Sequence, residues 1–316
     1  MLQAIPSESL FSFLTTVRTA ALPPDPALQL GPLCWGDVFE IQGSSGSGKS
    51  QLVYAMLATC IMPLSHNSAA LGGWGKAAVL FDTDGTFDAR QFRENFLLHL
   101  VRAFSRSNAF PDDAQLLAIA AEALQRLHVI RPASSAQLAA SIHHLPVYHK
   151  KHMADADIAL VAVDSLSAFY WPDRFAAEQP HTHSIPNNST PLHHVLTALQ
   201  AFRISHRPIT ILTNWGLALA NTAESSVDPL TAYKQHLPSF PSFPPITATH
   251  NLPFDMPSSI LPLTHHITLF LAPIPPFHGD ASFINRGQGE VIGYIRKPGS
   301  SQVVRFAVDI LSNDGL

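Results

Sequence analysis

The feature that most constrains this chain is a phosphate-binding loop sequence at residues 43–50. Its letters, Gly-Ser-Ser-Gly-Ser-Gly-Lys-Ser, match the pattern GxxxxGK[ST] at every fixed position. A strand-like stretch at residues 37–41 precedes the loop, and a helical pattern over residues 50–62 follows it. Such a loop presents backbone N–H groups and a helix N-terminus to an anion. The sequence therefore predicts a nucleotide site in a strand–loop–helix unit, and a flexible Gly/Ser turn is the alternative.

Every residue of the loop is a candidate for contact with the nucleotide. The candidates are Gly43, Ser44, Ser45, Gly46, Ser47, Gly48, Lys49 and Ser50. We expect the Lys49 ammonium to reach the β and γ phosphates and the Ser50 hydroxyl to bind Mg²⁺. The predicted cofactors are therefore ATP and Mg²⁺.

A second signal is an apolar strand at residues 158–163 that ends in the carboxylate of Asp164. In P-loop proteins an aspartate at this position faces the phosphates and contributes to the Mg²⁺ shell. The pattern is weak alone, because many aspartates that follow buried strands only cap a helix. Because it follows a phosphate-binding loop here, we expect Asp164 to take part in Mg²⁺ binding.

Two acids, Asp82 and Asp84, follow another apolar strand at residues 77–81, within the segment Phe-Asp-Thr-Asp-Gly-Thr-Phe. A carboxylate at this edge would orient the water that attacks the γ phosphate, which makes Asp84 the candidate catalytic residue. A turn rich in Asp and Gly explains the same residues equally well. The residues alone leave both interpretations open.

Strand-like apolar stretches alternate with helical patterns over most of the chain. The strands are expected at residues 37–41, 77–81, 127–130, 158–163 and 209–212, and the helices at 50–62, 92–104, 113–126, 136–149 and 191–204. This alternation predicts an α/β fold, a mostly parallel sheet covered by helices on both faces. Strand-like stretches at 266–271, 290–296 and 302–308 follow, and a turn at 297–300 makes the last two an antiparallel hairpin.

The sequence divides into a short leading segment and one core domain. Apolar residues spaced by three and four over residues 7–22 predict an amphipathic helix, and with its linker it makes up residues 1–35. Residues 36–316 are expected to form the core. A proline-rich loop is inserted between strands at about residues 220–264.

Composition narrows the possible classes of protein. Charged residues are 13% of the chain and apolar residues 46%, whereas charged residues make up about 25% of a usual globular protein. We therefore expect neutral polar loops together with an apolar face that is buried against another chain. The net charge of −4 predicts no strong sequence-independent grip on a phosphate backbone.

The cysteines and the hydropathy pattern bear on the compartment. Two cysteines are too few for a disulfide framework, and Cys60 is expected as a buried reduced thiol in an intracellular protein. No stretch approaches 18 unbroken apolar residues, and no basic start typical of a signal peptide is present. We expect neither membrane insertion nor secretion.

Histidine pairs and two aromatic residues are weaker candidates. The pairs at residues 143–144, 193–194 and 265–266 lack the cysteine or carboxylate spacing of a zinc site, so ordinary surface or helix histidines are expected. Tyr170 and Trp171 follow a buried strand end, where packing or contact with a partner is a better explanation than stacking on bases.

Several segments resemble the ATPase core of the eukaryotic RecA-type recombinases. They are the loop at 43–50, the segment at 81–87 and the closing stretch at 306–315. The eleven residues 164–174, Asp-Ser-Leu-Ser-Ala-Phe-Tyr-Trp-Pro-Asp-Arg, are similar to the signature of a recombinase paralogue, which is far more specific than a strand that ends in Asp. The resemblance covers roughly residues 7–216 well and the C-terminal strands loosely.

The resemblance implies a RecA-like fold and a nuclear role in homologous recombination. It also implies assembly with other recombinase paralogues that act on single-stranded or branched DNA. In this family aromatic residues ahead of the core commonly dock on the neighbouring domain, so Phe11 and Phe13 are the candidate partner anchors. Asp84 stands where active recombinases have a water-activating glutamate, and Trp215 stands where they have a γ-phosphate-sensing glutamine. Weak or absent hydrolysis is therefore expected.

These expectations combine into an ATP-binding accessory subunit of a complex that repairs DNA double-strand breaks by homologous recombination. One alternative is an active DNA-dependent ATPase that forms its own filament, which would need the glutamate, the glutamine and a basic DNA loop. The other alternative is a P-loop kinase of a small metabolite, which would need an arginine-rich lid. Residues 220–264 contain no arginine.

Overall fold

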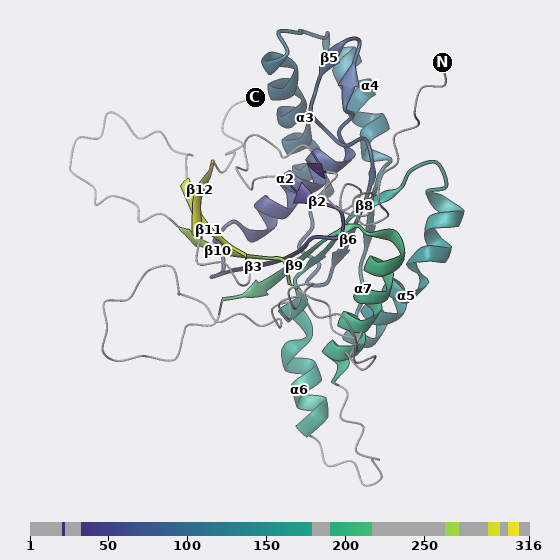
Figure 1. Cartoon of the computed structure of the whole chain (residues 1–316), viewed down its shortest axis with the longest axis vertical. Coiled ribbons are helices and arrows are strands. Elements are labelled where there is room, and N and C mark those ends of the chain that lie inside the picture. The colour runs from purple at the N-terminus through teal and green to yellow at the C-terminus, as the bar shows by residue number, and fades with distance from the viewer. Residues whose placement is uncertain are drawn as a thin grey trace, which may run out of the picture.

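An eight-stranded sheet lies at the centre of the computed structural model, which describes residues 21–22, 33–178, 190–216, 263–271, 290–297 and 303–309. Its strand order is β12-β11-β10-β3-β9-β8-β6-β7 (Figure 1). The strands are β3 (Val38–Gly43), β6 (Ala77–Asp82), β7 (Leu127–Ile130), β8 (Ile158–Asp164), β9 (Ile209–Trp215), β10 (His265–Leu271), β11 (Glu290–Arg296) and β12 (Val303–Asp309). The five strands predicted up to residue 212 are all present.

Six of these strands, from β10 to β7 in the sheet order, run parallel to one another, and the last two strands of the chain form the antiparallel end of the sheet. β10 pairs in parallel with β3, whereas β11 pairs antiparallel with both β10 and β12. Every residue of β3, β6 and β8 is buried, as expected for strands covered on both faces. The predictions of a mostly parallel α/β sheet and of a C-terminal antiparallel hairpin are confirmed.

Helices cover both faces of the sheet (Figure 1). They are α2 (Lys49–Ile61), α3 (Ala89–Arg106), α4 (Asp113–Leu124), α5 (Ser135–His152), the 3-10 turn η1 (Leu166–Phe169), α6 (Tyr170–Glu178) and α7 (Pro191–His206). Side chains of α2, α3 and α4 share one apolar core with Phe39 and Ile41 of β3. Side chains of α5 and α7 share the other with Val38, Val161 and Val163.

Side-chain caps begin four of the long helices. Each capping oxygen accepts a hydrogen bond from a backbone N–H of the first turn, which otherwise lacks a partner. The capping residues are Asp88 for α3, Asp112 for α4, Ser134 for α5 and Thr190 for α7. In α2 the capping residue is Gly48, and no side chain caps the first turn.

The segment ahead of the sheet differs from the prediction where it is described. Ala21–Leu22 form β1, which pairs antiparallel with β2 (Leu33–Cys34), so the helix predicted over residues 7–22 does not reach Leu22. Leu22 precedes a proline, and that position disfavours helical backbone. Phe11 and Phe13 lie outside the described residues, as does the proline-rich loop up to residue 262.

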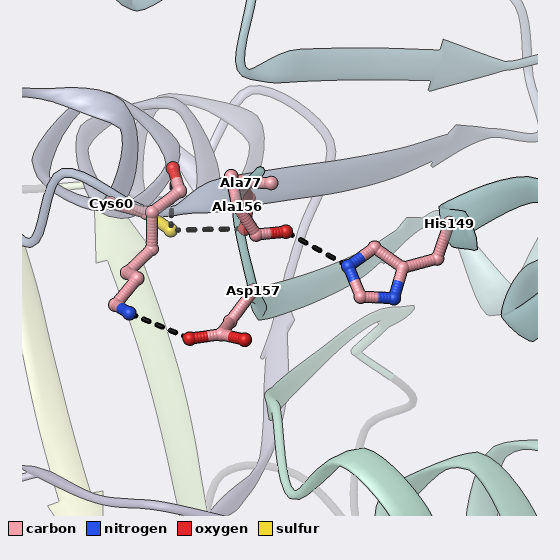
Figure 2. A network of polar contacts seen from close by, with 6 residues as sticks. Cys60, Ala77, His149, Ala156 and Asp157 are labelled. Carbon is pink, nitrogen blue, oxygen red and sulfur yellow. Dashed lines mark hydrogen bonds and ion pairs between the residues drawn. The ribbon is translucent and has the colours of Figure 1, made fainter. Parts of the chain in front are cut away.

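The edge of the sheet at which β6 and β8 begin is held by a polar network (Figure 2). Lys76 Nζ lies 2.7 Å from Asp157 Oδ2, and His149 Nε2 donates to the carbonyl of Ala156 at 2.8 Å. The Cys60 thiol donates to the Ala77 carbonyl at 3.5 Å. Cys60 is fully buried and not in a disulfide, and burial raises its pKa, as expected of an unreactive structural thiol.

One helix was not predicted, and one histidine pair lies elsewhere than expected. α6 projects from the body of the molecule and exposes Trp171 and Phe175 (Figure 1). The prediction of surface or helix positions is wrong for His265 and His266, because β10 is an interior strand between β11 and β3 and buries both. No helix in the described ranges has the length and apolar content to cross a membrane.

Candidate functional site

The loop at residues 43–50 joins the carboxyl end of β3 to the first turn of α2. Ser44, Ser45 and Gly46 are exposed, and the Ser47 N–H donates back to the Ser44 carbonyl at 3.2 Å. α2 begins at Lys49, so its first N–H groups point toward the space enclosed by the loop. The loop therefore lies at the positive end of the α2 helix dipole, which favours an anion.

Gly48 is fixed by two constraints of the loop. Its φ of 87° lies in the left-handed region that side-chain-bearing residues rarely adopt. A Cβ atom there would also lie 2.9 Å from Cγ2 of Val291 on β11. The C-terminal hairpin therefore packs directly against the loop.

Lys49 lies folded over the loop. Its Nζ donates to the carbonyl oxygens of Gly43 at 2.9 Å and Ser44 at 2.7 Å. Burial lowers the pKa of Lys49, while the carboxylates of Asp164 and Asp84 act in the opposite direction. The ammonium is thus held among neutral carbonyls, and an anionic phosphate would be a stronger partner for it.

Asp164 lies next to the loop at the carboxyl end of β8. Its Oδ1 accepts a hydrogen bond of 2.5 Å from the Thr213 hydroxyl on β9, and Ser50 also donates to the carboxylate. Burial raises the pKa of Asp164, and these two hydrogen bonds offset only part of that rise. A hydroxyl and a carboxylate oxygen are therefore close together beside Lys49, and both are ligand types that Mg²⁺ accepts.

The loop also contains a buried hydroxyl, that of Ser47, which packs against the backbone of Gly43. Ser47 Oγ is fully buried and has no hydrogen-bond partner within the described residues. The same residues hold no group of three or more His, Cys, Asp or Glu side chains suited to a metal ion. Ser50 and Asp164 fit a Mg²⁺ ion that takes most of its ligands from phosphate and water.

The two acids after β6 have different environments. Asp82 is buried and pairs with Arg131, whose Nε lies 2.7 Å from Oδ2, so its carboxylate is already engaged. Asp84 is exposed, and its Oδ1 accepts from the hydroxyl of Thr86 at 2.7 Å. Only Asp84 of the two presents its carboxylate to the surface beside the loop.

A cavity of about 500 Å³ lies at the carboxyl end of β9. Asn214 and Trp215 line it together with residues of η1, α6 and the first turns of α5 and α7. The Trp215 side chain is 47% exposed, and its backbone N–H donates to Ser167 Oγ at 3.1 Å. Tyr170 and Trp171 are exposed at the same cavity, so they do not pack in the core.

Sequence reasoning missed three contacts of this site. They are the Arg131–Asp82 ion pair, the Thr213–Asp164 hydrogen bond, and a hydrogen bond of 2.8 Å from Asn214 Nδ2 to Glu40 Oε1. Polar residues inside otherwise apolar strands were the available signal for the last two. Polar residues interrupt the apolar pattern in two segments, Asp37-Val-Phe-Glu-Ile-Gln and Ile209-Thr-Ile-Leu-Thr-Asn.

Comparison with known proteins finds relatives that match part of the chain. DNA repair protein XRCC2 from Mus musculus is 34% identical over 140 residues, which are 44% of this chain and 43% of that protein. The XRCC2 homolog from Arabidopsis thaliana is 25% identical over 48% of this chain and 46% of its own length. DNA repair and recombination protein RadA from Methanoculleus marisnigri is 28% identical over 42% of this chain and 36% of its own length.

This chain resembles a RecA-type recombinase paralogue of the XRCC2 kind. The sheet and its helices form a RecA-like core, in agreement with the similarity to RadA. No family model matches the chain. The matched stretch spans less than half the length of each of these relatives.

Proposed function

We propose that this chain is an ATP-binding accessory subunit of a recombinase-paralogue complex in homologous-recombination repair of DNA double-strand breaks. The observation that carries the proposal is the meeting of Lys49, Ser50 and Asp164 at one phosphate-binding loop. Two relatives are DNA repair proteins by name, and a third is a DNA repair and recombination protein. A nuclear location follows from such a role.

ATP with Mg²⁺ is the proposed ligand of the loop. The backbone N–H groups and the α2 N-terminus would hold the phosphates, and Lys49 would leave its two carbonyl acceptors to bind the β and γ phosphates. Ser50 and Asp164 would hold Mg²⁺, which neutralises charge on the phosphate oxygens. The experiment is a titration of the full chain with labelled ATP, with and without Mg²⁺. The absence of any binding by the folded protein would contradict the proposal.

Hydrolysis is proposed to be weak or absent. Phosphoryl transfer depends on positioning of the attacking water and on electrostatic stabilisation. Asp84 has a short, exposed carboxylate that is hydrogen-bonded to Thr86, and the indole of Trp215 has no acceptor with which to orient a water. The site therefore favours nucleotide binding over turnover, which argues against an active filament-forming ATPase.

Another RecA-type recombinase paralogue is the proposed partner chain. The chain is proposed to contact single-stranded or branched DNA as part of that complex. The low charged content of 13% and the exposed aromatic side chains of Trp171, Phe175 and Trp215 support an apolar contact with another protein. The anchors proposed from the resemblance are Phe11 and Phe13. Co-purification from nuclear extract tests this part. A soluble, monodisperse monomer at micromolar concentration, together with paralogue capture unchanged by Phe11→Ala and Phe13→Ala, would contradict it.

A further inference from the structure

A buried carboxylate, that of Glu40, lies on β3, three residues before the loop begins. Alternation along the strand places Phe39 and Ile41 in the core beneath α2, and Glu40 and Gln42 on the opposite face. Glu40 is 0% exposed. Burial of a carboxylate is unfavourable unless hydrogen bonds compensate, so its place in this strand calls for a specific partner.

That partner is the end of the neighbouring strand. Glu40 Oε1 accepts from Asn214 Nδ2 at 2.8 Å and from Gln42 Nε2 at 3.0 Å. Gln42 and Asn214 are themselves register partners in the parallel pair β3–β9. One carboxylate oxygen therefore joins two amides at the carboxyl ends of both strands.

Just beyond these amides, the ends of β3 and β9 are joined through the carbonyl oxygen of Gly43. The Gly216 N–H donates to the Gly43 carbonyl at 3.0 Å, and Lys49 Nζ donates to the same oxygen at 2.9 Å. A nucleotide that draws Lys49 toward its phosphates removes one of these two donors. The contact between Gly43 and Gly216 then depends on how firmly the end of β9 is held.

We infer that Glu40 is a positioning residue that acts through Asn214 to hold the end of β9 against the start of the loop. It links nucleotide binding at Lys49 to the surroundings of Trp215 at the cavity. The inference rests on the proposed ATP binding. It adds a route by which bound ATP alters the surroundings of Trp215, outside the loop.

The experiment measures ATP affinity and tryptophan fluorescence on the full chain in a Trp171→Phe background. We expect Glu40→Met and Asn214→Ala each to weaken ATP binding by about tenfold, the usual size of one lost buried hydrogen bond to a charged group. Both should also abolish the ATP-induced fluorescence change at saturating ATP, a change that Trp215→Phe assigns to Trp215. The double variant should bind ATP no more weakly than either single variant, because the two residues act as one unit.

Two variants provide the controls. Glu40→Gln keeps an acceptor oxygen and should recover the fluorescence change, with ATP affinity within about threefold of the parent. Thr210→Val changes a buried polar residue at the far end of the same strand pair, opposite Val38, and should leave both readouts unchanged.

If Glu40→Met binds ATP with wild-type affinity and keeps the ATP-induced fluorescence change of Trp215, the inference is overturned, whereas the proposed ATP binding is unaffected. If Glu40→Met does not fold, Asn214→Ala decides by the same two readouts, since its side chain lies at the cavity wall. Additive losses in the double variant would also overturn the inference. A parent protein that binds no ATP would contradict both the inference and the proposed function, so the two failures are distinguishable.

Discussion

The Thr213 hydroxyl donates a hydrogen bond of 2.5 Å to Oδ1 of Asp164, which joins the carboxyl ends of β9 and β8 beside the phosphate-binding loop. Burial alone would push this carboxyl toward its neutral form. The hydrogen bonds from Thr213 and Ser50 favour the ionised form that a cation requires. The strand order thus supplies Asp164 with a donor that favours the ionised form required for the proposed Mg²⁺ binding.

Asp164→Asn should remove the effect of Mg²⁺ on ATP affinity, because an amide offers the ion no negative charge. We expect Mg²⁺ to tighten ATP binding by at least about tenfold in the parent protein and by less than about twofold in the variant. Thr213→Val, which keeps the carboxylate, should show an intermediate effect. Calorimetric titrations with and without Mg²⁺ measure this, and full Mg²⁺ enhancement in Asp164→Asn would show that another residue holds the ion.

Lys49→Ala should weaken ATP binding by about ten- to a hundredfold, since the ammonium is a main positive charge facing the phosphates. Lys151→Ala is the matched control, because it removes one lysine from an exposed position on α5. Titration with labelled ATP should place the control within about twofold of the parent. Equal affinities in the two variants would contradict phosphate binding at Lys49.

Steady-state turnover of ATP should be slow or undetectable, and Asp84→Asn should not change it. Loss of water positioning typically lowers phosphoryl-transfer rates by orders of magnitude. Asp84→Glu restores the longer side chain and should raise the rate only slightly, because Trp215 is unchanged. Turnover at the rate of an active recombinase, abolished by Asp84→Asn, would instead favour the DNA-dependent ATPase.

His265 should make the protein less stable in mild acid. Its ring stacks on Phe39 with 4.3 Å between the centroids, and burial lowers its pKa to about 3. Between about pH 3 and pH 6.5 the unfolded chain therefore binds more protons at this position than the folded chain. Its contribution to the free energy of unfolding falls with decreasing pH, by up to about 1.4 kcal/mol per pH unit.

Urea unfolding at pH 5.0, 6.0 and 7.5 measures this dependence. His265→Gln should reduce the loss of stability between pH 7.5 and pH 5.0, whereas a variant at the exposed His144, His144→Gln, should keep the slope of the parent. The comparison between variants cancels the contributions of buried carboxyl groups such as Asp164. Identical slopes in all three proteins would refute the role given to His265.

Arg131→Ala should destabilise the fold by about 1–3 kcal/mol, because it leaves the buried Asp82 carboxylate without its cation. Arg131 Nη2 also donates to the Phe87 carbonyl at 2.8 Å, which fixes the segment that carries Asp84. Arg90→Ala breaks an exposed pair with Glu94 and should cost less than about 0.5 kcal/mol. Equal unfolding free energies for both variants would contradict a specific role for the buried pair.

The alternation of strands and helices could be predicted because short apolar stretches mark the strands, most clearly β6 and β8, which are apolar up to a terminal aspartate. β7 matches its predicted range of residues 127–130, and β6 and β8 each extend by one residue to a terminal aspartate. α6 was missed because it is only nine residues long and contains a proline, Pro172. The proline at its third position lies in the first turn, where a helix tolerates it.

The loop residues and Asp164 could be selected from sequence because each follows a recognisable strand. The hydrogen bonds and ion pairs that support these residues could not be predicted from the sequence. Glu40 and Asn214 lie 174 residues apart, and Asp82 and Arg131 lie 49 apart. Such pairs depend on which strands become neighbours, and the order β3-β9-β8-β6-β7 is set by the packing of the whole sheet.

The close contact between Val291 and Gly48 has a consequence for biosynthesis. The loop receives part of its wall from β11, which a ribosome delivers only after all the strands of the parallel part of the sheet. Until then a nascent chain can form β3, β6 and α2, but not the contact that restricts Gly48. Nucleotide therefore meets a fully packed loop only on a polypeptide that includes β11, and ATP analogues should protect chains that include β11 from protease far better than nascent chains arrested before residue 290.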